Sequence, residues 1–376
     1  MDDDPNGGGG SPGGDGAPDG TGAEPAGDVE RVVIMGAAGR DFHDFNVAFR
    51  DREDVEVVAF TQTAGQNVGE LDEPPQRRYP PALAGSGYPD GVSIRPEEEL
   101  EEIVRDEDVD AVYFSYSDVT HEHVMHCASR ALAAGADFRV LGPERIWLDC
   151  DVPVIAVDAV RTGCGKSQTT RRIAWLLDDR GSSFAIVREP MPYGDLERQR
   201  VQRFASMADV EAADVTVEER EEYEQHVENG HVVYGGVDYA AVRDAVQQEA
   251  DLLLWDGGNN ELPFYRPDLH VVLCDATRPG HEVRYHPGET NLRLADVVVI
   301  NKEDSAAEGA VAEIEANVEA VNSAAEVIHA ESRVSVSEED AALIDGATVL
   351  VVEDGPTMTH GGASHGAGLI AAEQEG

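Results

Sequence analysis

The sequence predicts an α/β protein with two parallel-sheet domains in tandem. Short apolar runs alternate with amphipathic stretches along most of the chain, and two of these runs lead directly into glycine-rich turns. The length of 376 residues corresponds to about two to three domains. Alternating strands and helices of this kind form a parallel sheet that helices cover on both faces.

The first expected domain spans residues 29–150 and is Rossmann-like. An apolar run at 32–35 enters the turn Gly36-Ala37-Ala38-Gly39, and an amphipathic stretch then leads to a second apolar run at 55–60. This is the order strand, turn, helix, strand. The turn lacks the full Gly-x-Gly-x-x-Gly pattern, so ligand binding by this domain stays open. Residues 1–28 contain mainly Gly, Pro, Asp and Ala and are expected to be a disordered tail.

The second expected domain spans residues 151–376. Residues 195–249 are too long for a simple crossover and predict a helical insertion rich in Glu and Arg. The apolar runs expected to form its strands are 152–157, 184–187, 250–255, 270–274, 297–300 and 348–352.

Charge excludes several classes of partner. The chain has 28 Lys and Arg against 75 Asp and Glu, a formal net charge of −47, which repels nucleic acids and anionic membranes. The sequence shows neither a membrane-length apolar run nor a signal-peptide pattern, which predicts a cytoplasmic protein. Its four cysteines form no CxxC pair.

Lysine occurs only at 166 and 302. A chain that is so acidic and so poor in lysine indicates a halophilic protein, because molar salt screens the repulsion among its carboxylates.

A phosphate-binding loop follows the run at 152–157. The segment is Arg161-Thr162-Gly163-Cys164-Gly165-Lys166-Ser167-Gln168, followed by an amphipathic helix. Backbone N–H groups converge on phosphate oxygens in such a loop, Lys166 reaches the outer phosphates and the Ser167 hydroxyl ligates Mg²⁺. Val160 replaces the first glycine of the general pattern, which favours a variant P-loop in which Arg161 acts on phosphates of its own site or a partner subunit's. This indicates a P-loop NTPase domain and leaves a homo-oligomer open.

A second nucleotide motif follows the run at 297–300. In Asn301-Lys302-Glu303-Asp304 the lysine stem is expected to pack over the loop, and the Asp304 carboxylate to accept hydrogen bonds from the base. The two lysines of the chain occupy the two lysine positions of two nucleotide motifs, which strengthens the prediction. Such a motif reads guanine, so GTP stays open beside ATP.

Two further features suggest catalytic and substrate groups. Asp256 ends the apolar run at 250–255 and is the candidate carboxylate for Mg²⁺ and catalysis, with an ordinary turn residue as the alternative. Arg188, Arg278, His281 and Arg284 follow strands and are the candidate binding groups for a small anionic substrate. Salt bridges to the many carboxylates are the alternative for these arginines.

The chain from about residue 32 to 368 resembles the archaeal cyclic 2,3-diphosphoglycerate synthetase family. The matching stretches include VVIMGAAGRDFHDFN, AVRTGCGKSQTTRR, RPGHEVRYHPGETN, ADVVVINK and VVEDGPTMTHGG. The resemblance implies that ATP drives closure of 2,3-diphosphoglycerate to its cyclic intramolecular anhydride, with release of ADP and phosphate. A nucleotide-hydrolysing switch or chaperone and a nonenzymatic nucleotide sensor are the alternatives.

Two departures from the family qualify that function. Family members continue past the Thr359-His360-Gly361-Gly362 stretch, whereas this sequence ends at Gly376. We therefore expect catalysis, rather than folding, to be affected. A halophilic lineage also leaves room for a changed substrate on the same scaffold.

Overall fold

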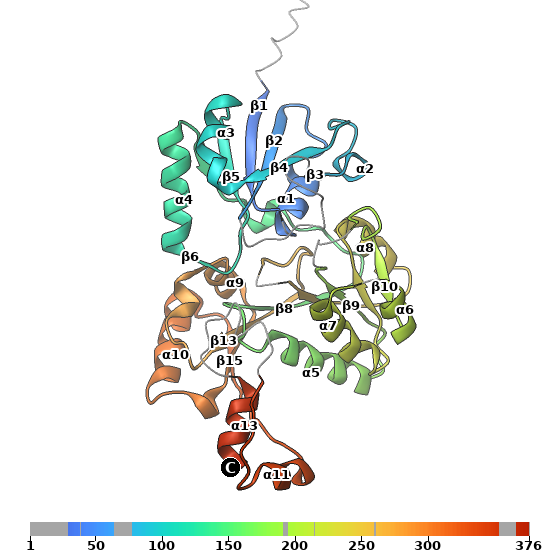
Figure 1. Cartoon of the computed structure of the whole chain (residues 1–376), viewed down its shortest axis with the longest axis vertical. Helices are drawn as coiled ribbons and strands as arrows, with labels where there is room; N and C mark the ends of the chain where they lie inside the picture. Colours follow the sequence, from blue (N-terminus) through green and yellow to red (C-terminus); the bar gives the residue numbers. More distant parts are fainter. Residues whose placement is uncertain are drawn as a thin grey trace, which may run out of the picture.

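The computed structural model describes residues 29–37, 39–63, 77–190, 195–213, 215–258, 261–352 and 366–375. The tail expected at residues 1–28 lies outside these ranges. The described residues form two large, mostly parallel sheets, one above the other in Figure 1, with a small helical segment beyond the second. The predicted α/β class is therefore confirmed. In the described ranges, no helix is both long enough and apolar enough to cross a membrane.

The first sheet has the strand order β3-β4-β2-β1-β5-β7 and is parallel except for β3. Its strands are β1 (Glu30–Met35), β2 (Val55–Gln62), β3 (Arg78–Tyr79), β4 (Val92–Pro96), β5 (Ala111–Phe114) and β7 (Asp137–Arg139). Alternate residues of β1 face opposite cores. Ile34 packs with Phe42 of α1 (Arg40–Ala48), whereas Val33 packs with Ile103 of α3 (Leu100–Asp106). The short α2 (Pro81–Ala84) lies on the α1 side.

Helix α4 (His121–Ala134) covers the same face as α3, and its ends follow standard capping chemistry. The Thr120 side chain accepts a hydrogen bond from the His123 backbone N–H, and Gly135 ends the helix in the left-handed conformation. Both faces of the first sheet are therefore covered.

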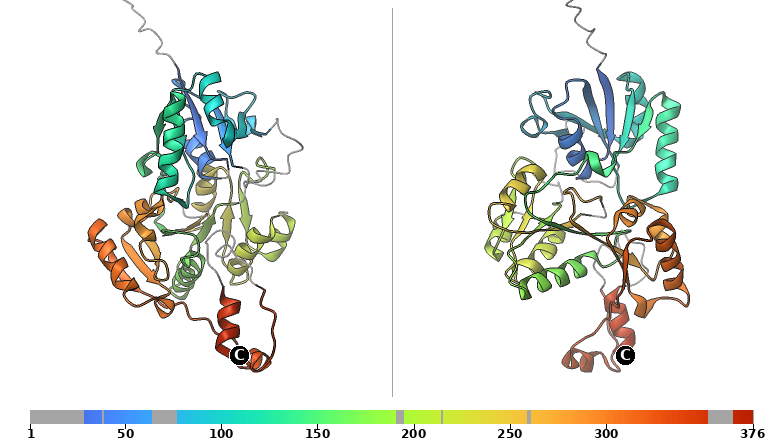
Figure 2. Two further views of the ribbon diagram at one scale, coloured as in Figure 1. Left: turned by 60° about the vertical axis from the view of Figure 1, so that its left-hand side comes forward. Right: turned by 180° about the vertical axis from the view of Figure 1, so that it is seen from behind.

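The second sheet has the order β10-β11-β9-β12-β8-β13-β15-β16 and is parallel except for β10. Its strands are β8 (Val154–Ala159), β9 (Ala185–Arg188), β10 (Gln202–Phe204), β11 (Val233–Gly235), β12 (Leu253–Gly257), β13 (Leu269–Asp275), β15 (Val297–Asn301) and β16 (Glu326–His329). Helices α5 (Lys166–Asp179), α9 (Gly288–Leu294) and α10 (Ala310–Val321) pack on one face, and α8 (Tyr239–Val246) packs on the other. Figure 2 shows both sheets and their helices from two further sides.

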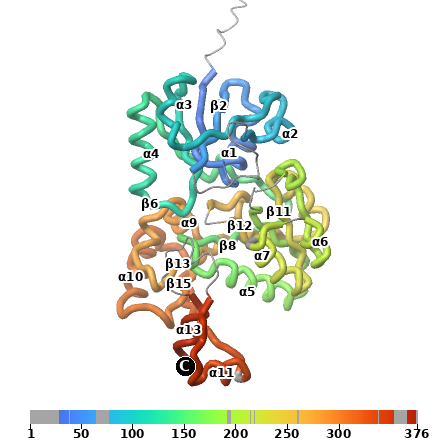
Figure 3. Tube along the Cα trace, viewed as in Figure 1, coloured from blue at the N-terminus to red at the C-terminus, as the bar shows by residue number. Residues whose placement is uncertain are grey.

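Two expectations for this part of the chain need correction. The insertion at 195–249 holds α6 (Met207–Ala212), α7 (Val217–Val227) and α8, but also β10 and β11, which extend the sheet beyond β9. The strand expected at 348–352 is absent: its described residues are irregular, and Leu350 is 89% exposed. The sheet ends at β16 on this side, and the run at 348–352 does not pair with it. Helices α11 (Glu338–Ile344) and α13 (Ala367–Glu375) form the terminal segment visible in Figure 3.

The carboxyl ends of strands from the two sheets meet at an interface that we call the junction. The two-stranded sheet of β6 (Val119–Thr120) and β14 (Tyr285–His286) crosses it. His43 of α1 stacks on Phe264 with ring centroids 4.1 Å apart, and its Nε2–H donates to the Ile146 carbonyl oxygen at 2.7 Å. The imidazole is 1% exposed and is held neutral.

We predict that acid weakens the fold through His43. Burial lowers the pKa of His43 from its ordinary 6.5 to about 3; the Arg40 charge aids this effect, whereas the hydrogen bond to Ile146 and the Asp238 charge oppose it. As the pH falls from about 6.5 towards 3, the His43 imidazole binds a proton in the unfolded chain but stays neutral in the folded chain. The free energy of unfolding should therefore fall by up to about 1.4 kcal/mol per pH unit from this group. Denaturant unfolding at constant molar salt measures that slope.

The variant His43→Gln can still donate to the carbonyl of Ile146, and it should lose this share of the slope. His126→Gln, at an exposed position on α4, is the matched control and should keep the slope of the parent. Equal slopes in the His43 variant and the parent would contradict the assignment.

Candidate functional site

The phosphate-binding loop lies between β8 and α5, as the motif predicts. Gly163 and Gly165 have φ values of 84° and 104°, which favour glycine, and a Cβ at Gly165 would collide with the Asn301 amide. Helix α5 begins at Lys166, so its unpaired N-terminal N–H groups lie in the loop. The loop and helix end form the kind of site that holds a phosphate group.

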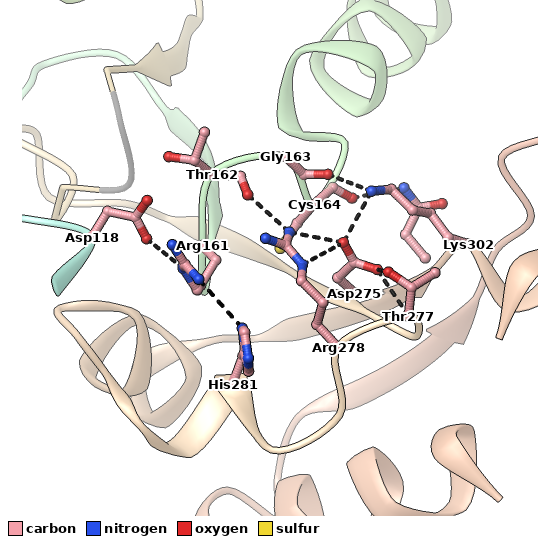
Figure 4. Close-up of polar contacts among 11 residues, drawn as sticks. Asp118, Arg161, Thr162, Gly163, Cys164, Asp275, Thr277, Arg278, His281 and Lys302 are labelled. Carbon is pink, nitrogen blue, oxygen red and sulfur yellow. Dashed lines mark hydrogen bonds and ion pairs between the residues drawn. The ribbon is translucent and has the colours of Figure 1, made fainter. Parts of the chain in front are cut away.

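Two side chains of the motif at the end of β15 hold this loop in place by hydrogen bonds. Asn301 Nδ2 donates to the Cys164 carbonyl oxygen at 2.8 Å, and Lys302 Nζ donates to the Gly163 carbonyl oxygen at 2.6 Å. Figure 4 shows Lys302 also reaching the Asp275 carboxylate, at 2.9 Å. The structure thus brings together the two motifs that hold the two lysines, with Lys302 packed against the loop as predicted.

Arg278 is a second brace for the loop. It donates to the Thr162 carbonyl oxygen at 2.8 Å and pairs with Asp275 at the same distance (Figure 4). Although burial raises the pKa of Asp275, Lys302 and Arg278 outweigh it and lower that pKa. In this arrangement Arg278 holds the loop rather than an open substrate pocket.

Lys166 is held by Asp256, which is fully buried at the end of β12. The Lys166 ammonium donates to the Asp256 backbone carbonyl and lies 3.4 Å from Oδ1, and Thr170 Oγ1 donates to Oδ1 at 2.5 Å. Arg188 pairs with the other carboxylate oxygen and with Glu222. Burial raises the pKa of Asp256, but the Arg188 and Lys166 charges outweigh it and hold that pKa far below its usual range. Burial lowers the pKa of Lys166.

These contacts bear on the expected Mg²⁺ ligands. The Ser167 hydroxyl makes no side-chain hydrogen bond to any described residue, and it fits a metal ligand beside a bound phosphate. Both oxygens of Asp256 already face the donors of Thr170, Lys166 and Arg188, so Asp256 fits a positioning role better than direct ligation. Within the described ranges there is no group of three or more His, Cys, Asp or Glu side chains able to hold a metal ion.

The remaining arginines are not gathered into one pocket. Arg161 turns towards the first sheet, where its Nε donates to Asp118 at 2.8 Å and its guanidinium lies 3.9 Å from the Tyr285 ring centre. His281 lies 3.5 Å from Arg161 (Figure 4), and burial, followed by the Arg161 charge, lowers the pKa of His281. Arg284 is exposed.

Two residues expected to bind the nucleotide, Asp304 and Gln168, lie close to one another. Asp304 is exposed, and its Oδ1 accepts a hydrogen bond from the Ser332 backbone N–H at 2.8 Å. The Ser332 hydroxyl donates to Gln168 Oε1 at 3.3 Å. Asp304 and Gln168 are therefore joined through Ser332.

Sequence reasoning missed a group of buried charges at the junction, formed by Glu189, Glu261 and Arg40. Glu189 directly follows β9, Glu261 follows β12, and Arg40 begins α1 after the turn from β1. Burial, reinforced by the Glu261 charge, raises the pKa of Glu189, and burial raises that of Glu261. Position after a parallel strand was the one signal for the two glutamates, and it is weak among 75 acidic residues.

Comparison with known proteins adds family evidence. The model of the P-loop domain of cyclic 2,3-diphosphoglycerate synthetase matches residues 229–330, a stretch that includes Asp256 and Asn301 but begins after the loop itself. The arginine synthetase of Thermococcus kodakarensis is 54% identical over 347 residues, which are 92% of this chain and 76% of that protein.

Solved structures are similar at much lower identity. LpxK of Aquifex aeolicus, solved with ATP, is 17% identical, with 41% of this chain and 49% of that chain covered and a TM-score of 0.29. A ParA family ATPase of Chlorobium tepidum is 12% identical, with 51% and 86% covered and a TM-score of 0.30. Neither likeness is close enough to carry an argument.

Nucleotide affinity should depend on Lys166. Lys166→Ala removes a charged donor to phosphate, an interaction of about 1.5–3 kcal/mol, so affinity should fall roughly 10- to 150-fold. Titration of a fluorescent ATP analogue in molar KCl measures it. Arg203→Ala, which breaks the exposed pair with Glu249 and a contact with Tyr234, is the control and should bind like the parent. Parent-like affinity and turnover in the Lys166 variant would rule out the P-loop interpretation.

Proposed function

Because this chain belongs to the cyclic 2,3-diphosphoglycerate synthetase family, with an arginine synthetase as a 54% identical relative, we propose that it is an ATP-dependent ligase that forms arginine. The observation that carries the proposal is the phosphate-binding loop with Lys166 at the start of α5, close to buried carboxylates of the junction. The 54% identity to an arginine synthetase, over 92% of this chain, supports arginine as the product.

The chemistry of the product suggests the reaction. A guanidinium group arises when a nitrogen replaces the oxygen of a urea-type carbon. The γ-phosphoryl group of ATP passes to that oxygen, the bond from the γ-phosphorus to ADP breaks, and ADP leaves. Ammonia then forms the new C–N bond, the C–O bond breaks, and phosphate leaves with the proton that the nitrogen loses. The substrates in this proposal are a ureido amino acid, a nitrogen nucleophile and ATP.

The residues have distinct parts in this proposal. The loop at 163–167 holds the phosphates, and Lys166 exchanges Asp256 for the transferring phosphoryl group, whose charge it neutralises. Asp256 positions the lysine, and Arg188 in turn holds Asp256. Ser167 would hold Mg²⁺, which when bound neutralises phosphate charge. Asn301, Lys302 and Arg278 keep the loop in the shape that receives the nucleotide.

Closure of 2,3-diphosphoglycerate is the second candidate. The match to the synthetase P-loop domain at residues 229–330 supports it. Its substrate carries about four to five negative charges, which the arginines would have to neutralise. Arg278 and Arg188 are already paired with carboxylates, and the junction beside Lys166 holds two more carboxyl groups. These contacts favour a substrate with a cationic nitrogen over a polyanion.

Product analysis separates the candidates. Incubation with ATP and Mg²⁺ in molar KCl, with either a ureido amino acid plus ammonium or 2,3-diphosphoglycerate, is followed by amino-acid analysis and phosphorus NMR. We expect arginine, ADP and phosphate in equal amounts from the first mixture and none with Lys166→Ala. A cyclic anhydride from the second mixture, without arginine from the first, would establish the second candidate. Nucleotide hydrolysis without either product would favour a switch, and binding alone a sensor.

We also predict that the chain prefers ATP to GTP. Asp304, the residue expected to read guanine, is exposed and already accepts the Ser332 N–H, so it is poorly placed to select a base. Competition between the two nucleotides in the fluorescence titration measures the preference, and Asp304→Ala should change it less than threefold. A hundredfold preference for GTP, lost in that variant, would contradict this prediction and favour the switch.

A further inference from the structure

The junction brings two carboxyl groups together beside the phosphate-binding loop. A Cβ at Gly258 would stand 2.9 Å from Glu261 Oε2 and would collide with Glu189 Oε2, so both groups converge on one glycine. Gly39, in the turn after β1, faces the other oxygen of Glu189 equally closely. Glycine at both places leaves room for the two carboxyl groups, which we call the Glu189–Glu261 pair. The pair lies where β1, β5, β9 and β12 end.

Each carboxyl group keeps an oxygen without a partner. Glu261 Oε1 accepts a hydrogen bond from Ser117 Oγ at 3.1 Å, while its Oε2 is buried and accepts none. Glu189 Oε1 is likewise buried and unpartnered. Lys166 is the lysine whose charge reaches both groups, and its own hydrogen bonds go to Asp256. Buried acceptors without donors are costly, and a ligand that brings donors would satisfy them.

Arg40 provides an independent observation at the same place. Its side chain is 2% exposed, and none of its three guanidinium nitrogens donates a hydrogen bond in the described part of the chain. The nearest carboxylate oxygen is that of Asp44 at 3.7 Å, and Asp44 already accepts the Ser115 hydroxyl at 2.7 Å. The Arg40 charge reaches Glu261, since it lowers the pKa of that group against the larger effect of burial. A buried guanidinium with free donors fits a carboxylate.

We propose that the junction is an amino-acid subsite, in which Arg40 binds the α-carboxylate and the Glu189–Glu261 pair binds a cationic nitrogen group. The ligand class is a zwitterionic amino acid with a further nitrogen cation, which a polyanion does not match. The subsite rests on the proposed function, because it places the acceptor substrate beside the phosphoryl group that Lys166 receives. The nitrogen cation comes from one of two sources, the guanidinium of bound arginine or an ammonium ion, which must lose a proton before it can attack as ammonia.

Calorimetric titration of the whole chain in molar KCl, with ADP and Mg²⁺ present, tests the subsite without turnover. The probes are arginine, its neutral ureido analogue, arginine amide and ammonium chloride. The parent should bind arginine at least tenfold more tightly than the ureido analogue, because only arginine brings a cation to the pair. Ammonium that strengthens binding of the ureido analogue would identify the nucleophile as the second source, and its lack of effect would leave the guanidinium as the source.

Three variants divide the subsite into its parts. Glu189→Gln and Glu261→Gln should each weaken arginine at least tenfold and leave the ureido analogue within threefold. Arg40→Gln should weaken both ligands but not arginine amide, which lacks the carboxylate. Nucleotide affinity should stay unchanged, because the loop at 163–167 binds it separately. Glu249→Gln, at the exposed pair with Arg203, is the matched control.

Folding is followed in the same samples. The Gln variants of the pair should melt at or above the temperature of the parent, since each replaces a buried carboxyl group that has an unpartnered oxygen with a neutral amide. A lower melting temperature with parent-like arginine affinity would overturn the subsite and give the pair a structural role. Arginine formation from ATP together with parent-like binding in the variants would overturn the subsite alone. Absence of both arginine formation and arginine binding in the parent would overturn the proposed function too.

Discussion

The carboxylate of Asp256 is the interaction on which the active end of the second sheet depends. It is fully buried at the end of β12, where an uncompensated charge would cost several kcal/mol. Lys166 from α5, Arg188 from β9 and Thr170 from α5 all turn towards it. The carboxylate therefore connects β9, β12 and α5, and it fixes the position of Lys166 beside the phosphate-binding loop. Its loss would remove the carboxylate partner of the buried Lys166 ammonium, whereas Arg188 would keep its ion pair with Glu222.

A second constraint comes from the way the two sheets face one another. Parallel sheets place loops and helix N-termini at the carboxyl ends of their strands, and ligands of open α/β proteins bind there. Here the ends of β1 and β5 meet those of β9 and β12, so the turn at Gly39 lies against Glu189. Polar groups of both sheets thereby become buried in one place. Because the two sheets face one another in this way, the phosphate-binding loop and the buried charges lie next to each other.

Sequence predicted the main architecture and the phosphate-binding loop, because both depend on local patterns. Apolar runs identified β8, β9, β12, β13 and β15, and the two lysines identified the loop and its brace. The strand expected at 348–352 was wrong because hydrophobicity alone does not show whether a run pairs with the edge of a sheet, which here ends at β16. The partners of Arg161 and Arg278 lie on segments distant in sequence, so spacing could not separate bracing arginines from substrate-binding ones. Glu189 and Glu261 become distinctive only through burial.

The contacts around the loop also explain how a nucleotide can bind without reorganising the site. Asn301, Lys302 and Arg278 hold three successive loop carbonyls from outside, at Cys164, Gly163 and Thr162, so the loop shape does not depend on phosphate. In the proposed function Lys166 exchanges one anionic partner, Asp256, for another, the phosphoryl oxygens. Binding therefore exchanges one charge-assisted contact for another, and Asp256 keeps Arg188 and Thr170 when the lysine moves. In the proposed reaction, a lysine preorganised in this way would add little reorganisation to the transfer step, which is where electrostatic stabilisation has its largest effect.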